Sequence, residues 1–201
     1  MLDAACELFV REGASTVSLR KVASALGVTP MALYRHVDNK EDLLARVLHR
    51  GYQEFHAYLS RDAGGRRGLA RLRAASAGFG AFALERASYF DLMFLGRSLP
   101  NDLGGEDSVR EVALPTFKLL RDCVHEAIDM GELEGAEPQS TAVTLLAQAT
   151  GVIALHRTGL FAWTDDEARV QLEAAVEHVL RGFSGPPQNG TAVSSTASDP
   201  S

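Results

Sequence analysis

The chain has 201 residues, of which 46% are hydrophobic and 23% charged, and its formal net charge is −6. The apolar fraction is enough for a buried core and excludes a disordered chain, while 18 glycines and 7 prolines exclude collagen-like and low-complexity sequences. The acidic balance argues at first against a protein that covers nucleic acid with positive charge.

The N-terminus, the apolar runs and the cysteines predict the cellular compartment. Residues 1–5 lack the basic segment of a secretory signal. The most apolar run, residues 142–155, contains polar residues and is shorter than the roughly 20 residues that a membrane span needs. Cys6 and Cys123 are too few for a disulfide framework, and each lies in an apolar helical pattern. We therefore expect a cytoplasmic protein with free thiols and no membrane segment.

Apolar residues recur at helical spacing along most of the chain, and no alternating run is long enough for a strand, so the predicted fold class is all-α. The first helix carries an apolar face that includes Ala5 and Phe9 and ends at Gly13. Ser18 is the predicted N-cap of a second helix over residues 19–26.

Two further N-terminal helices are predicted from their first residues. Thr29 followed by Pro30 is typical of an N-cap and the first residue of a short helix, here running to about His36. Asp38, with Glu41 three residues later, is predicted to cap a fourth helix that reaches residue 60.

After residue 60 a glycine-rich charged joint over residues 64–68 precedes a larger helical region over residues 61–183. Its helices are predicted to break near Ser88 and over residues 100–106, 131–138 and 159–165. Residues 184–201 lack an apolar period and are predicted to be a disordered tail.

Residues 18–37 combine two short helices with a glycine turn between them, which predicts a helix-turn-helix. Such a unit places its second helix in the major groove of DNA while the first crosses the backbone. The apolar residues spaced to pack both helices on the first one are Val22, Ala23, Leu26, Val28, Leu33 and Val37. The alternative is an ordinary three-helix packing unit with a basic face.

Positive charge is concentrated at this unit. Residues 18–40 hold four basic residues and one acid, a local charge of +3, whereas residues 1–60 are neutral with seven of each sign. Residues 61–201 carry 13 basic and 19 acidic residues and account for the whole deficit. An acidic body behind a basic patch repels DNA everywhere except at the intended face, which predicts weak non-specific binding.

The side chains outside the predicted core suit DNA contacts. Arg20 is the best candidate for a bidentate contact to guanine. Met31 and Ala32 allow close approach and a contact with a thymine methyl group. The Tyr34 hydroxyl suits a phosphate, as does Lys40 at the start of the fourth helix, where backbone N–H groups also favour an anion.

The N-terminal segments SLRKVA (18–23), LGV (26–28), ALYRHV (32–37) and NKEDLL (39–44) resemble the DNA-binding domain of the TetR family of bacterial transcriptional regulators. The resemblance covers residues 1 to about 50 and is specific in order and spacing. It implies that DNA is touched by Ser18, Arg20, Lys21, Thr29, Met31, Ala32, Tyr34, His36 and Lys40.

The resemblance also implies a domain organisation. Residues 1–50 would form the helix-turn-helix DNA-binding domain, with a connecting helix over 39–60, and residues 61–183 a helical ligand-binding and dimerisation domain. Family members usually have a basic extension before the first helix. Here Met1 already belongs to that helix, so arm contacts are absent or the start is truncated.

Residues 79–94 resemble the ligand domain of one subset of the family, which has a similar Phe-Ala-Leu to Leu-Met-Phe segment. Most of its aromatic and methionine side chains are predicted to be core, with one or two facing a cavity. Polar residues within apolar helices and aromatic residues in a loop are further candidates, although such polar residues are more often satisfied core residues. The ligand-binding candidates are Phe82, Met93, His125, Gln148, His156, Phe161 and Trp163.

Catalytic and metal-binding interpretations find little support. His125 and Asp129 stand one helical turn apart, and His49 and His56 two turns apart, without a third ligand at suitable spacing. No nucleophile elbow, phosphate-binding loop, dinucleotide fingerprint or zinc-type cysteine pair occurs. We expect no enzyme activity, no cofactor and no metal.

The last two helices, over 142–155 and 170–183, carry broad apolar faces, whose surplus surface usually meets another chain. Taken with this surface, the resemblance to the TetR family implies a homodimer through a four-helix interface. The alternative is that these faces are buried within their own domain. The apolar stripe of the final helix is Val170, Leu172, Ala175, Val176, Val179, Leu180 and Phe183.

The predicted function is sequence-specific DNA-binding regulation of transcription. A homodimer would repress by binding a palindromic double-stranded operator, and a small-molecule effector would release it. One alternative is a helical small-molecule binding protein with a non-functional helix-turn-helix, favoured by the neutral charge of residues 1–60 and the missing arm. Another is an activator.

Overall fold

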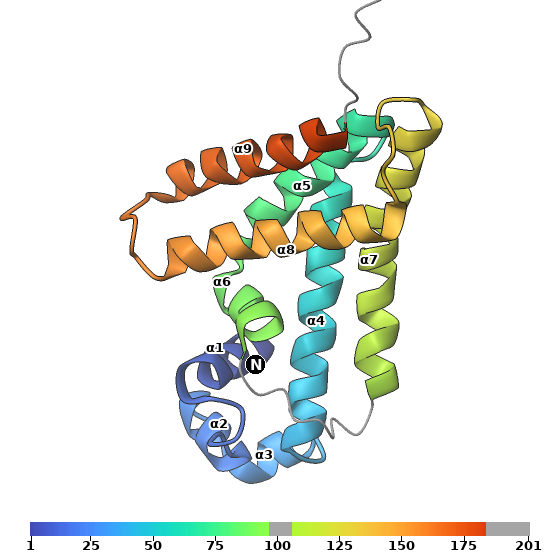
Figure 1. Ribbon diagram of the computed structural model, residues 1–201. Helices are drawn as coiled ribbons and strands as arrows, with labels where there is room; N and C mark the ends of the chain where they lie inside the picture. The colour runs from blue at the N-terminus through green and yellow to red at the C-terminus, as the bar shows by residue number, and fades with distance from the viewer. Residues whose placement is uncertain (97–105, 184–201) are drawn as a thin grey trace, which may run out of the picture.

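The computed structural model describes residues 1–96 and 106–183 (Figure 1). In these ranges the chain is helical and has no strand, which confirms the all-α prediction. The elements are α1 (Leu2–Glu12), α2 (Leu19–Ala25), α3 (Pro30–Tyr34), α4 (Lys40–Arg61), α5 (Gly68–Glu85), α6 (Ala87–Phe90), the π-helix η1 (Asp91–Leu95), α7 (Glu106–Asp129), α8 (Pro138–Arg157) and α9 (Asp165–Phe183). The predicted tail and most of the predicted break over residues 100–106 lie outside the described residues.

Side-chain caps begin the helix-turn-helix elements where the sequence predicts. Ser18 Oγ accepts the backbone N–H of Lys21 at 3.3 Å, and Thr29 Oγ1 accepts that of Ala32 at 3.2 Å. Gly27 turns the chain between α2 and α3 with φ of 67°, a left-handed conformation that glycine adopts without strain. The sequence therefore fixes both ends of the turn locally.

The predicted cap of α4 is wrong by one residue. Asn39, not Asp38, is the N-cap, and its side chain accepts the N–H of Asp42 at 2.7 Å. The Asp42 carboxylate in turn accepts the backbone N–H of Asp38 at 3.0 Å. The extended backbone of Asn39, with φ of −153° and ψ of −178°, places its side chain over the first turn.

Helix α4 runs from the small N-terminal head formed by α1–α3 into the larger body (Figure 1). Helices α5 and α7 pack along it, while α8 and α9 form an antiparallel pair across the far end. Between α4, α5, α6 and η1 lies an aromatic core with ring centroids 5.0 to 5.9 Å apart. Its rings belong to Phe55, Phe79, Phe82, Phe90 and Phe94.

Cys6 and Cys123 are buried and free, as expected. Burial raises the pKa of the Cys6 thiol to about 12 and also raises that of Cys123. None of the described helices is both long and apolar enough to cross a membrane.

Candidate DNA-binding surface and effector sites

Helix α3 presents large side chains that the core does not use. Leu33 is buried and anchors the helix, whereas Met31 is 69% exposed and Tyr34 50% exposed. A five-residue helix held by one buried leucine stands clear of the body, at the end of the head farthest from α8 and α9 (Figure 1). This geometry suits entry into a groove of DNA.

The other predicted contact residues share this surface. Ala32 and Lys40 are half-buried, and the remaining predicted DNA contacts are exposed. Val28, which the spacing assigns to the core, is instead 44% exposed and belongs to the same surface. The turn after Gly27 carries it away from α1.

The two basic residues of α2 differ in their surroundings. Lys21 Nζ forms an ion pair with Glu12 of α1 at 2.8 Å, and this contact holds the pKa of the Glu12 carboxyl below its usual range. Arg20 is exposed and, among the described residues, no carboxylate lies within 4.0 Å of it. Arg20 is therefore the freer of the two to bind DNA.

A polar junction that the sequence analysis missed joins the head to the body. The Arg86 guanidinium lies 3.0 Å from Asp3 Oδ1 of α1 and 2.6 Å from Glu54 Oε2 of α4. Tyr89 donates its hydroxyl to the same Asp3 oxygen at 2.9 Å, and the guanidinium stands 4.9 Å from the Tyr89 ring centroid. No sequence signal points to this cluster, because its members are up to 86 residues apart.

The structure separates the predicted ligand-binding residues. Phe82 and Met93 are buried, Phe82 within the aromatic core. The expectation that His125 is a polar group within a buried helix run is wrong, because it is exposed on α7 and bonded to Asp129 at 2.9 Å. The apolar residues next to it in the sequence, such as Val124 and Ala127, are buried on another side of α7.

The remaining candidates lie on α8 and in the α8–α9 loop. Gln148 Oε1 and His156 Nδ1 are buried and have no hydrogen-bond partner in the part of the chain that the structure describes, while His156 Nε2 lies 3.1 Å from Asp165. Phe161 and Trp163 stack on each other with centroids 4.7 Å apart.

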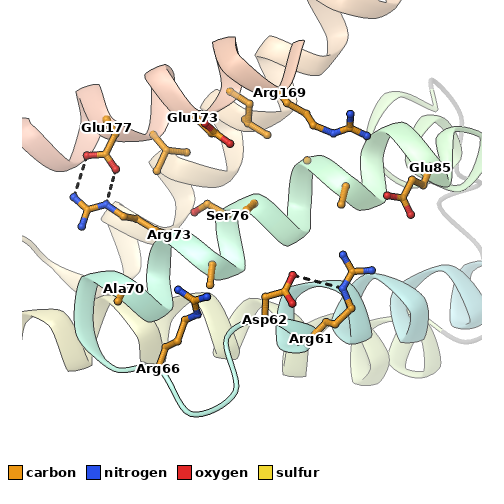
Figure 2. A pocket seen from close by; sticks show the side chains of 16 residues that line it. Arg61, Asp62, Arg66, Ala70, Arg73, Ser76, Glu85, Arg169, Glu173 and Glu177 are labelled. Atoms are coloured by element: carbon orange, nitrogen blue, oxygen red, sulfur yellow. Dashed lines mark hydrogen bonds and ion pairs between the residues drawn. The ribbon is translucent and has the colours of Figure 1, made fainter. Parts of the chain in front are cut away.

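Two hollows are open at the surface, and none of the predicted ligand-binding residues lines either. The larger, of about 800 Å³, is a groove between α5 and α9 that also touches the end of α4 (Figure 2). The smaller, of about 370 Å³, lies between the end of α1 and η1, beside the Asp91–Arg157 ion pair of 2.6 Å. Within the described ranges no group of three metal-ligating side chains comes together.

A short exposed helix behind a glycine turn, on a basic surface carried by a helical body, defines a helix-turn-helix DNA-binding protein. Comparison with known proteins gives the family. The model of bacterial regulatory proteins of the tetR family matches residues 1–47, and that of the tetracyclin repressor-like C-terminal domain matches residues 72–179. The chain belongs to the TetR family of bacterial transcriptional regulators.

Individual relatives are distant. The chain is 43% identical over 47 residues to the HTH-type transcriptional regulator AcrR of Shigella flexneri, covering 23% of this chain and 22% of that protein. It is 25% identical over 95 residues to the uncharacterized HTH-type regulator YobS of Bacillus subtilis, covering 47% and 50%. The matches thus span at most half the length of these relatives. The crystal structure of the TetR-family regulator PfmR of Thermus thermophilus superposes with a TM-score of 0.74 at 20% identity, covering 90% and 96%.

Proposed function

We propose that this protein is a sequence-specific transcriptional repressor that binds a palindromic operator as a homodimer in the cytoplasm and is released by a small-molecule effector. The observation that carries the proposal is the α3 surface, where the large side chains of Met31 and Tyr34 are exposed to solvent and are not used to build the core. Family membership supports the same interpretation.

In this proposal α3 enters the major groove, and the surrounding side chains contact either bases or phosphates. Arg20, free of an acidic partner, reads a guanine edge, and Met31 with Ala32 contacts a thymine methyl group. Tyr34 and Lys40 bind phosphates and fix the register. The other residues proposed to touch the backbone are Ser18, Lys21, Thr29 and His36.

We propose that two copies pair through α8 and α9. Along α8 one row at four-residue spacing is exposed and uncharged, formed by Val143, Ala147, Gly151 and Leu155. The predicted stripe of α9 divides in the structure, because Leu172, Val176 and Leu180 are buried in their own domain while Val170 is 59% exposed. The proposed interface therefore rests on the α8 row and on the outer face of α9, and a two-fold axis would bring both faces together.

Release by an effector requires that the body and the head move together. The Arg86 junction is suited to this, because it ties α1 of the head to α4 and α6 of the body. An effector with different affinities for two arrangements of the body would then favour one spacing of the two heads over the other.

The test is selection of bound DNA from a random pool, followed by gel-shift titration of three variants on the selected operator. Arg20→Ala should weaken binding by about tenfold or more and relax base preference at one position. Lys40→Ala should weaken binding to all sequences and lower the slope of log affinity against log salt by about one. Tyr34→Phe should weaken binding without changing base preference, because it removes a phosphate contact.

Arg121→Ala is the matched control, since Arg121 is an exposed arginine on α7 in the body. It should bind the operator as the wild type does. Unchanged affinity in all three head variants would overturn the assigned contacts. Failure to select any sequence would favour the helical small-molecule binding protein instead.

A further inference from the structure

The place where the sequence predicts an effector pocket is filled. Phe82 is fully buried, and its ring centroid lies 5.0 Å from that of Phe55 and 5.7 Å from that of Tyr58. Space for a ligand is instead found in the α5–α9 groove, whose volume of about 800 Å³ is in the range of small-molecule sites (Figure 2).

The floor of the groove is apolar because of small residues on one face of α5. Ala70, Ala74, Ala77 and Ala81 follow each other at spacings of four, three and four residues, so they share one side of the helix. Larger side chains at these positions would fill the space. Leu172 and Val176 of α9 form the facing apolar wall.

At Gly80, α5 lies against α9. A Cβ atom at Gly80 would lie 2.6 Å from Leu172 Cδ2, so any larger residue here would require the Leu172 side chain to shift. The ion pair between Arg73 of α5 and Glu177 of α9, at 2.5 and 3.0 Å, ties the helices together along the same groove. The groove is thus a built feature of the packing.

Most of the charged side chains around the groove are paired with each other or with neighbours, and the two that are not indicate the chemistry of the ligand. Glu177 is occupied by Arg73, Glu85 accepts the Tyr58 hydroxyl at 2.9 Å, and Arg61 lies 3.6 Å from Asp62. Arg169 is bonded to Asp166 at 2.6 Å.

Arg66 has no acid within 4.0 Å among the described residues, and its guanidinium points toward α5 (Figure 2). It stands two residues before the positive N-terminal end of α5. Across the groove Glu173 also has no basic side chain within 4.0 Å in the described part of the chain, and a hydroxyl or amine on the ligand body would satisfy it.

We propose that the α5–α9 groove binds an effector with an anionic head group on Arg66 and an apolar body along the alanine face of α5. The identification of this ligand as an effector rests on the proposed function, whereas its binding does not. The site is connected to the head through α5 itself, since Arg86 follows the last residue of that helix directly. A ligand that shifts α5 against α9 would therefore change the contact between Arg86 and Asp3.

The test is fluorescence titration of the full chain without DNA, using two probes with the same rings. 1-Anilinonaphthalene-8-sulfonate is an anion with an apolar body, and N-phenyl-1-naphthylamine lacks the sulfonate. Arg66→Gln should raise the dissociation constant of the sulfonate at least about tenfold and leave that of the neutral probe unchanged. Ala77→Leu should raise the dissociation constants of both probes by a similar factor, because the larger side chain fills the apolar floor of the groove. Ala77 is exposed, so the larger side chain is compatible with folding.

Arg121→Gln on α7 is the matched control and should bind both probes as the wild type does. Circular dichroism and the thermal midpoint confirm that each variant is folded. Wild-type affinity of Arg66→Gln for the sulfonate, or of Ala77→Leu for both probes, would overturn the site. Because DNA is absent from these titrations, their failure is distinguishable from failure of operator binding.

Discussion

At the scale of single residues, the junction between head and body depends on the ionised carboxylate of Asp3. Its hydrogen bond from Tyr89 and the neighbouring Arg86 guanidinium hold the pKa of Asp3 below its usual value of 3.8. A carboxyl group whose pKa is lowered by folding stabilises the native state above its unfolded pKa, and this contribution is lost as the pH falls through the folded pKa. The junction should therefore weaken only in acid.

We expect Tyr89→Phe to lower the free energy of unfolding by about 0.5–1.5 kcal/mol at pH 7, because the bond to the partly exposed carboxylate is lost. At pH 3 the loss should be smaller, because the fraction of folded molecules with a protonated Asp3 is larger there than at pH 7. Urea unfolding followed by circular dichroism at both values measures this. Tyr34→Phe is the control and should change stability at neither pH, because Tyr34 is half exposed on α3. An equal loss for Tyr89→Phe at both values would contradict the assignment.

Single-residue features were predictable from the sequence where their cause is local. Ser18 and Thr29 cap the helices that directly follow them, so their roles depend on neighbours three residues away. The contacts of Arg86 and Gly80 depend on helices brought together by tertiary packing. The apolar surroundings of His125 along the chain likewise say nothing about which side of α7 faces solvent.

At the scale of elements, α4 decides how the head is attached to the body, and its first turn is held by a pair of reciprocal contacts. The sequence predicted this helix well but placed its cap on Asp38, because Asp38 and Glu41 have the spacing of a capping box. Asn39 and Asp42 have the same spacing. Only the backbone conformation of the turn distinguishes the two pairs.

Replacement of each candidate cap separates these two interpretations. Asn39→Ala should cost about 1 kcal/mol of stability, because the N–H of Asp42 loses its acceptor. Asp38→Ala should cost little, since Asp38 contributes only a backbone N–H to the contact with Asp42. Thermal and urea unfolding of the two variants give the comparison, and a larger loss for Asp38→Ala would show that the cap is misassigned.

Other elements were not predictable for a common reason. The π-helical turn over Asp91–Leu95 has no distinct apolar period. The small residues of α5 are equally compatible with an ordinary buried helix that has no groove beside it. Their roles depend on the elements they pack against: η1 contacts α1 of the head, and the small residues of α5 face α9 across the groove. Helix count and order follow from periodicity, whereas the hollows between helices do not.

At the scale of the whole molecule, the proposed operator binding depends on the distribution of charge and on the proposed pairing of two copies. The net charge of −6 belongs entirely to residues 61–201, while residues 18–40, which include α2 and α3, carry a local charge of +3. One such surface has too few cations for tight binding, and Lys21 already shares its charge with Glu12. In the proposed complex, affinity would then come from two heads held at a fixed spacing, so we expect operator binding to depend on dimerisation.

The exposed row of α8 provides the test of this condition. We expect Leu155→Glu to weaken dimerisation by about 100-fold or more, because a two-fold interface loses each leucine contact twice and gains two charges. Sedimentation velocity should show a monomer at micromolar concentration, and operator affinity should fall with it. Leu114→Glu, at a similarly exposed leucine on α7, should remain dimeric. A Leu155→Glu protein that sediments as the wild type does would place the interface elsewhere.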